Sequence, residues 1–248
     1  MELLKKRLGE LAEKSYRNNQ YLFTNFLNMA EMNAFYEMKR EISHVPVTAF
    51  GGTQNCERLM LRFGSEELFG YEEPFPICCI HIRPLMEKFA DDLTHRDFLG
   101  AIMNLGIERE VVGDISIKGK SAYIFCTEKI APYLAEHLVQ VKHTSVMCSI
   151  LEEVPAILSP TLEPREVIVP SERIDAVLGK LCNLSRSQSA EAFREKKVFV
   201  NGRQCENNSY QLKAGDVVTC RGFGKFIYQG VKYGTKKGKS CVEVSVYV

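Results

Sequence analysis

The strongest constraint on the fold of this chain is a proline-rich segment that separates two parts of opposite charge. Four of the nine prolines fall in residues 152–171, namely Pro155, Pro160, Pro164 and Pro170. This spacing disfavours a helix and extends the chain. Residues 1–170 hold 18 Lys and Arg against 24 Asp and Glu, a net charge of −6, whereas residues 171–248 hold 14 against 7, a net charge of +7. We therefore predict a linker at 152–171 and a separate basic domain at 172–248.

The composition is that of a soluble globular protein, with 45% hydrophobic and 25% charged residues in 248. The apolar run Ile77–Ile80 is too short to span a bilayer. The first residues lack the apolar stretch and cleavage site of a signal peptide. We expect a cytoplasmic protein of two or three domains with no membrane partner.

The nine cysteines and five histidines do not indicate a metal site. No cysteine pair has the C-x-x-C spacing of a zinc or redox site, and the histidines lack metal-ligand spacing. An odd cysteine count without a secretion signal argues against disulfides. Most cysteines lie in apolar runs, so we predict buried thiols, and we expect no cofactor, metal or small-molecule substrate.

Residues 1–75 are predicted to form a helical region with a short strand pair. Leu4, Leu8 and Leu11 mark one face of a first helix. A second helical stretch is expected from Tyr21 to Ile42. The strand-like runs Val47–Phe50 and Arg58–Phe63 follow.

Residues 76–151 alternate between strand-like and helical patterns. The predicted order is β-α-β-β-α-β, the ferredoxin-like arrangement, which many RNA-recognition modules and many unrelated proteins share. The whole chain is thus expected to be α+β. The predicted elements are Ile77–Ile82, Thr94–Leu105, Val111–Ile117, Ala122–Cys126, Ile130–Val139 and Ser145–Leu151.

Tyr123 and Phe125 alternate along one of these predicted strands, after the basic turn at Lys118. Aromatic side chains at such positions stack on RNA bases in RNA-recognition modules. The same alternation is typical of a core face packed against two helices, and we favour that interpretation.

The basic domain has a recognisable local order. Ile174, Val177, Leu178 and Leu181 predict an amphipathic helix. Ser185 and Gln188 form a capping box for a second helix, which places Arg186 in its first turn. The amide groups and positive dipole end there favour phosphate, although a solvated surface charge is the alternative for Arg186. Asp175 is expected to orient Arg173 through a charge-assisted bond.

A predicted hairpin follows the second helix. Its strand at 198–200 comes after Lys196 and Lys197, and Asn201-Gly202 is a strong hairpin signal. The basic, glycine-rich segment 232–239, which contains Lys236 and Lys237, either tracks a phosphate backbone or is a solvated loop. The alternating valines at 242–248 predict a closing strand.

Residues 172–187, 196–202 and 215–225 together resemble the S4 RNA-binding domain. The resemblance implies that this domain grips folded RNA through its basic residues. The candidate RNA-binding residues are Arg173, Lys180, Ser185, Arg186, Ser187, Gln188, Arg194, Lys196, Lys197, Asn201, Gly202, Arg203, Arg221 and Lys225.

Two further stretches extend the resemblance to the bacterial YlmH family over nearly the full length. One is Gly51-Gly52 with Glu57-Arg58, and the other runs from Thr94 through Arg109 to 113–115. The resemblance implies an RNA-recognition-like central fold, association with the large ribosomal subunit, and a role in ribosome-associated quality control of stalled nascent chains. Its implied partners are rRNA and, as a further candidate, tRNA.

Two alternative functions compete with this hypothesis. An RNA-modification enzyme, or its accessory subunit, would need a nucleotide loop or catalytic motif, and none appears. His95-Arg96-Asp97 resembles a kinase catalytic loop without the kinase context, and more plainly opens a helix capped by Thr94. A protein-interaction adaptor linked to cell division would use the acidic first 170 residues. We predict a non-enzymatic RNA-binding protein.

Overall fold

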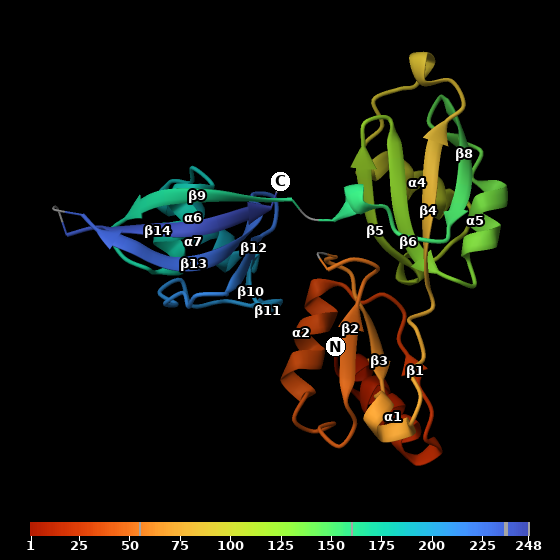
Figure 1. Ribbon diagram of the computed structural model, residues 1–248, viewed down its shortest axis with the longest axis horizontal. Coiled ribbons are helices and arrows are strands. Elements are labelled where there is room, and N and C mark those ends of the chain that lie inside the picture. Colours follow the sequence, from red (N-terminus) through yellow and green to blue (C-terminus); the bar gives the residue numbers. More distant parts are fainter. Residues whose placement is uncertain (55, 160, 236–237, 248) are drawn as a thin grey trace. The chain divides into compact units, whose positions relative to one another are not determined.

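The computed structural model describes residues 1–54, 56–159, 161–235 and 238–247. The chain divides into two compact units, Met1–Ser159 and Pro160–Val248. Both are mixtures of helices and strands (Figure 1). No helix of the described residues is long and apolar enough to cross a membrane.

The first part of unit 1 is a small layer of helices on a three-stranded antiparallel sheet. Buried Leu8 and Ala12, from the predicted first helix, pack with Phe35 and Phe63. The sheet order is β1-β3-β2. Its elements are α1 (Glu2–Asn18), β1 (Leu22–Phe23), α2 (Met29–Met38), β2 (Val47–Phe50), β3 (Met60–Phe63) and α3 (Glu66–Phe69).

The prediction of one helix from Tyr21 to Ile42 was wrong. The segment opens with β1, which pairs with β3 far along the chain, and α2 begins only at Met29. Asn28 ends the extended segment, because its side chain caps α2 together with Glu31. A helical apolar pattern cannot reveal a strand that exists only through a distant partner.

The second part of unit 1 is a five-stranded antiparallel sheet in the order β5-β6-β4-β8-β7. Helices α4 and α5 cover one face of it (Figure 1). The core between them holds Ile80, Ile82, Phe98, Ile124 and Leu134. The elements are β4 (Ile77–Pro84), η1 (Glu87–Phe89), α4 (His95–Asn104), η2 (Arg109–Val111), β5 (Val112–Lys118), β6 (Ser121–Thr127), α5 (Ala131–His137), β7 (Gln140–Val141), β8 (Thr144–Leu151) and η3 (Ala156–Leu158).

Tyr123 and Phe125 do not face these helices, so the interpretation that we favoured from the sequence is wrong. The helix-facing positions of β6 are Ala122, Ile124 and Cys126. Phe125 is instead buried on the opposite face, and Tyr123 lies half-buried on that same face. Alternation fixes which residues share a face, but it does not say which layer covers that face.

Unit 2 is a six-stranded antiparallel sheet in the order β11-β10-β12-β13-β14-β9, with two helices on one face. Its core contains Ile174 and Leu178 of α6, Phe193 of α7, and Tyr228 and Val244 of the sheet. The elements are β9 (Leu162–Val169), α6 (Ile174–Leu181), α7 (Arg186–Arg194), β10 (Val198–Val200), β11 (Arg203–Gln204), β12 (Val217–Cys220), β13 (Gly224–Gly234) and β14 (Ser240–Tyr247).

Most of the segment predicted as a linker at 152–171 is structured, so that prediction needs correction. Residues 162–169 form β9, which pairs with β14 along its whole length. The prolines are tolerated because β9 is an edge strand, with a neighbouring strand on one side only. Pro164 has no amide proton, and an edge strand can accommodate a missing donor. Pro160, Lys236, Lys237 and Val248 lie outside the described residues.

All nine cysteines are thiols that are buried or half-buried. Their burial confirms that they pack as small hydrophobes. Burial raises the pKa of the Cys148 and Cys220 thiols to about 11, which keeps them protonated and unreactive at neutral pH.

Candidate nucleic-acid interface

A groove between α6 and the start of α7 gathers part of the predicted RNA-binding set. α6 forms because Ile174, Val177 and Leu178 bury one face against the sheet. Its exposed face and the N-terminus of α7 then bound an open groove. The candidate residues that line it are Arg173, Lys180, Ser185 and Arg186.

Arg173 is held in place at one end of this groove. Its Nε donates to Asp175 Oδ1 at 3.0 Å and its Nη2 donates to Asp175 Oδ2 at 2.6 Å. The hydrogen bond and charge of Asp175 raise the pKa of Arg173 above its ordinary value. This two-point bond confirms the predicted role of Asp175, which fixes a planar cation facing the groove.

The start of α7 has the predicted capping box. The Gln188 amide donates to Ser185 Oγ at 3.2 Å, and the Ser185 amide donates to Gln188 Oε1 at 2.9 Å. Ser187 Oγ lies 3.0 Å from Ser185 Oγ. Arg186 is the first residue of the helix and is exposed. Backbone amides of the first turn and the positive end of the helix dipole therefore lie beside an exposed cation.

The groove is positively charged. Arg173, Lys180 and Arg186 line it against one acid, Asp175. Lys180 and Arg186 have no hydrogen bond or ion pair with any residue that the structure describes. Two cations thus remain available for an anionic ligand beside one that is already oriented.

The cations that follow α7 lie outside this groove and are partly neutralised. Lys196 Nζ is 3.6 Å from Glu206 Oε1, and Lys197 Nζ is 2.5 Å from Glu195 Oε2. Arg194 is exposed in the last turn of α7. These three residues do not join Arg173 and Arg186 in one site.

Asn201 and Gly202 form the predicted hairpin turn, with φ of 52° and 76°. The Asn201 Nδ2 donates to Asp216 Oδ1 at 2.8 Å, and its Oδ1 accepts the Val217 amide at 2.9 Å. Both polar ends of Asn201 are therefore used to hold the turn, and Arg203 follows it in β11. The geometry gives Asn201 a structural role.

Replacing Asn201 by alanine should lower the free energy of unfolding of unit 2 by about 2 kcal/mol, because two hydrogen bonds and a residue tolerant of positive φ are lost. Urea unfolding of the full chain, followed by circular dichroism, checks this expectation. Gln211→Ala is the control, since that exposed side chain makes no hydrogen bond with the described residues. Equal free energies of unfolding in the two variants would mean that the hydrogen bonds of Asn201 do not stabilise the turn.

Arg221 and Lys225 lie on the other face of the sheet. The Arg221 guanidinium is 4.7 Å from the ring centroid of Phe199, and Lys225 Nζ is 4.8 Å from that of Tyr247. The helix-facing residues of the same strands are Val218, Cys220 and Phe226. The predicted residues are thus divided between two faces of unit 2.

Sequence reasoning did not find every residue that lines the groove. Asn208 comes from the loop after β11, and its carbonyl accepts the Asp175 amide at 3.3 Å. Buried Ser189 donates to the Asp175 carbonyl at 3.4 Å. No local pattern marks these positions, because the packing of α7 and a distant loop against α6 brings them together.

The stretches around Arg58 and Arg109, which carry the resemblance to the YlmH family, join the two parts of unit 1. Arg58 donates to the carbonyl oxygens of Val112, Phe26 and Arg109 at 2.9–3.2 Å. Asp114 accepts the amides of Glu57 and Arg58 at 2.6 and 3.1 Å. Burial, and then the charge of Arg58, lowers the pKa of Arg109 to about 10. We call these contacts the Arg58 clamp.

His95, Arg96 and Asp97 open α4, as predicted, with Thr94 as the capping residue. Hydrogen bonds from Lys142 and Thr94 lower the pKa of Asp97 to about 2. That carboxylate is committed to the helix cap and unsuited to act as a base. Among the described residues, no cluster of three His, Cys, Asp or Glu could hold a metal ion.

Comparisons with known proteins identify two domain families in this chain. A family described as "Putative RNA-binding domain in YlmH" matches residues 71–154, and the S4 domain matches residues 172–218. The ribosome-associated protein quality control protein P2 of Bacillus subtilis (strain 168) is 28% identical over 193 residues, covering 76% of this chain and 73% of its own length.

The solved cell division protein ylmH from Streptococcus pneumoniae is 21% identical, covers 59% of this chain and 88% of its own, and superposes with a TM-score of 0.47. A likeness this weak does not bear on the fold.

The matched regions define the class, an RNA-binding domain followed by an S4 domain whose helices form a cationic groove. Within that class, the two domain matches and the relative from Bacillus subtilis support the YlmH family for this chain.

Proposed function

We propose that this protein is a non-enzymatic RNA-binding protein that docks on the large ribosomal subunit through the groove between α6 and α7. The observation that carries the proposal is that Arg173, Lys180 and Arg186 line one groove beside the N-terminus of α7. Phosphate oxygens suit all of these donors, and rRNA presents them in a fixed folded array. tRNA bound to the ribosome is a further candidate.

The chemistry of the groove supports binding of RNA shape rather than sequence. Arg173 is already oriented by Asp175, so little of its side-chain entropy is lost on binding. The remaining cations lie on helices that the core holds in place. Bases in the deep groove of an RNA helix are poorly accessible, so phosphate and ribose positions determine the fit.

The relative from Bacillus subtilis supports the ribosomal setting, because its name links it to ribosome-associated quality control. We propose the same setting for this chain, with action on stalled nascent chains. The basic charge of residues 171–248 is consistent with electrostatic attraction to RNA.

We further propose that residues 1–75, 76–151 and 172–248 act as separate functional parts. The strand order β5-β6-β4-β8, with α4 and α5 on one face, supports a ferredoxin-like arrangement for the central part. The Arg58 clamp holds the first two parts together.

Sedimentation of the full chain with ribosomal subunits in a sucrose gradient tests the proposal. We expect the protein to travel with the large subunit at low salt and to be released as salt increases, because bound counterions are displaced by each phosphate contact. The Lys180→Glu, Arg186→Glu variant should remain at the top. Wild-type protein at the top under both salts would contradict ribosome binding.

A further inference from the structure

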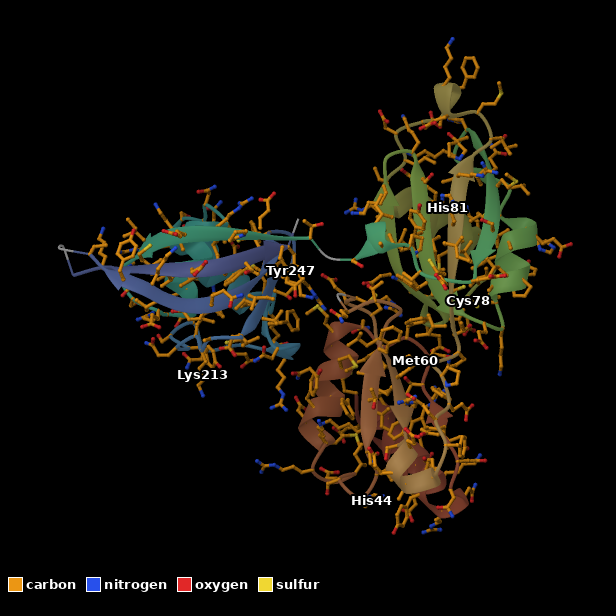
Figure 2. All side chains as sticks on the ribbon, viewed as in Figure 1. His44, Met60, Cys78, His81, Lys213 and Tyr247 are labelled. Atoms are coloured by element: carbon orange, nitrogen blue, oxygen red, sulfur yellow. The ribbon has the colours of Figure 1, made fainter. Side chains whose placement is uncertain are left out.

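The face of the central sheet opposite α4 and α5 is covered at one end only. Near the start of β4, Cys79 and Phe125 are buried in a cluster with Phe26 and Met60 of the N-terminal part and Leu158 of η3, and Tyr123 is partly buried against this cluster. Further along β4, His81 is half-buried and Arg83 is exposed. Figure 2 shows His81 farther than Cys78 from the part that contains Met60. The cover therefore reaches the side of Tyr123, and the uncovered end begins at the His81–Tyr123 pair.

His81 and Tyr123 form a stacked aromatic pair where this cover ends. They lie directly opposite each other on β4 and β6. Their ring centroids are 4.6 Å apart and their planes differ by 8°, so the rings stack. Burial, and then the charge of Arg83, lowers the pKa of His81, which keeps the imidazole neutral at neutral pH. An uncharged aromatic pair of this kind can stack with any nucleobase, because every base has a π-face.

Two exposed cations flank the aromatic pair on the same face. Arg83 is two residues beyond His81, and Lys118 is opposite Ser121, the residue two before Tyr123. Neither cation has a hydrogen bond or ion pair with the residues that the structure describes. The acid of β5, Asp114, is bound by the Glu57 and Arg58 amides at the covered end. The uncovered end is therefore complementary to a phosphate backbone.

We propose that this face binds single-stranded RNA, with an unpaired base stacked against the His81–Tyr123 pair and phosphates at Arg83 and Lys118. The inference rests on the proposed RNA-binding function and adds a second site with a different ligand. Bases in a duplex are stacked on each other and cannot reach a sheet surface, so this site takes unpaired nucleotides. The α6–α7 groove takes folded RNA.

The absence of tryptophan from the chain permits a direct test. Tyr123→Trp places one indole on the proposed surface of the full-length protein. A ten-nucleotide oligouridylate should quench its fluorescence in a saturable manner, because a base stacks on the ring. Tyr133→Trp is the matched control, since Tyr133 also stacks on a histidine, His137, at 4.2 Å and 18°, but on α5. Quenching that is equal in both variants would overturn the site.

Loss of the aromatic pair gives a second measurement. The His81→Ala, Tyr123→Ala variant should bind the oligouridylate about 10-fold or more weakly, the effect expected when base stacking is removed. The Tyr133→Ala, His137→Ala variant should bind it like the wild type. Unchanged affinity in the first variant would overturn the proposal.

Crosslinking of the unmodified chain guards against a variant that fails to fold. Wild-type protein irradiated with a 4-thiouridine oligonucleotide should give adducts on peptides from β4 or β6, and adducts confined to other peptides would overturn the proposal. Sedimentation with ribosomal subunits separates the two hypotheses. Ribosome binding without quenching would overturn this inference alone, whereas loss of both would also overturn the proposed function.

Discussion

Replacing Lys180 and Arg186 together by glutamate should weaken binding to folded RNA about 100-fold near physiological salt. Both side chains line the groove, and neither is paired with a described acid. Each lost phosphate contact removes the release of about one counterion, and each new carboxylate repels the phosphates that remain. The affinity of the full chain for a labelled rRNA fragment, measured by fluorescence anisotropy, checks this expectation.

The salt dependence gives an independent measure of the same prediction. The slope of log affinity against log salt should be shallower in the variant by about two, because two phosphate contacts are missing. A loss of affinity with an unchanged slope would show that the variant had damaged the fold rather than the contacts.

A matched control comes from the same unit. Arg165→Glu with Lys213→Glu changes the net charge by the same amount, but neither residue lines the groove. The control should retain most of the affinity if position matters more than total charge. Equal loss in both double variants would mean that unit 2 attracts RNA by its overall charge, without a defined site.

Features of the candidate site that depend on near neighbours were predictable from the sequence. The Ser185–Gln188 capping box, the Arg173–Asp175 bond and the Asn201-Gly202 turn each involve residues no more than three apart. Local geometry of this kind is fixed by the chain itself. The residue types at those positions therefore carried enough information.

Features that depend on distant partners were not predictable. β1 and β9 are strands because β3 and β14 lie beside them. The groove also depends on distant partners, because Asn208 and Ser189 must lie near Asp175. The burial of Phe125 depends on the cluster that it shares with Phe26. Lys225 lies on the sheet face away from α7 and Arg186 because of its register in β13, which a single sequence does not reveal.

The second large effect is expected at the Arg58 clamp. Replacing Arg58 by alanine should lower the free energy of unfolding of unit 1 by about 3 kcal/mol. The guanidinium satisfies three carbonyl groups, from Phe26, Arg109 and Val112, that lie between the N-terminal and central parts. Without it the Phe26 carbonyl loses this donor in a partly buried place, whereas Val112 O keeps the Arg109 guanidinium and Arg109 O keeps the Val112 amide. Removing three hydrogen bonds from a charged donor at this junction costs more than losing one surface contact.

Urea unfolding of the full chain, combined with hydrogen exchange measured by mass spectrometry, checks this prediction. Peptides that contain Phe26 and Val112 should lose protection, while peptides of unit 2 should keep theirs. Arg96→Ala is the control, because Arg96 is an exposed arginine of the same unit without a hydrogen bond to any described residue. Unchanged protection in the Arg58 variant would mean that water replaces the guanidinium, and that the buried cluster that contains Phe26 and Phe125 holds the two parts together by itself.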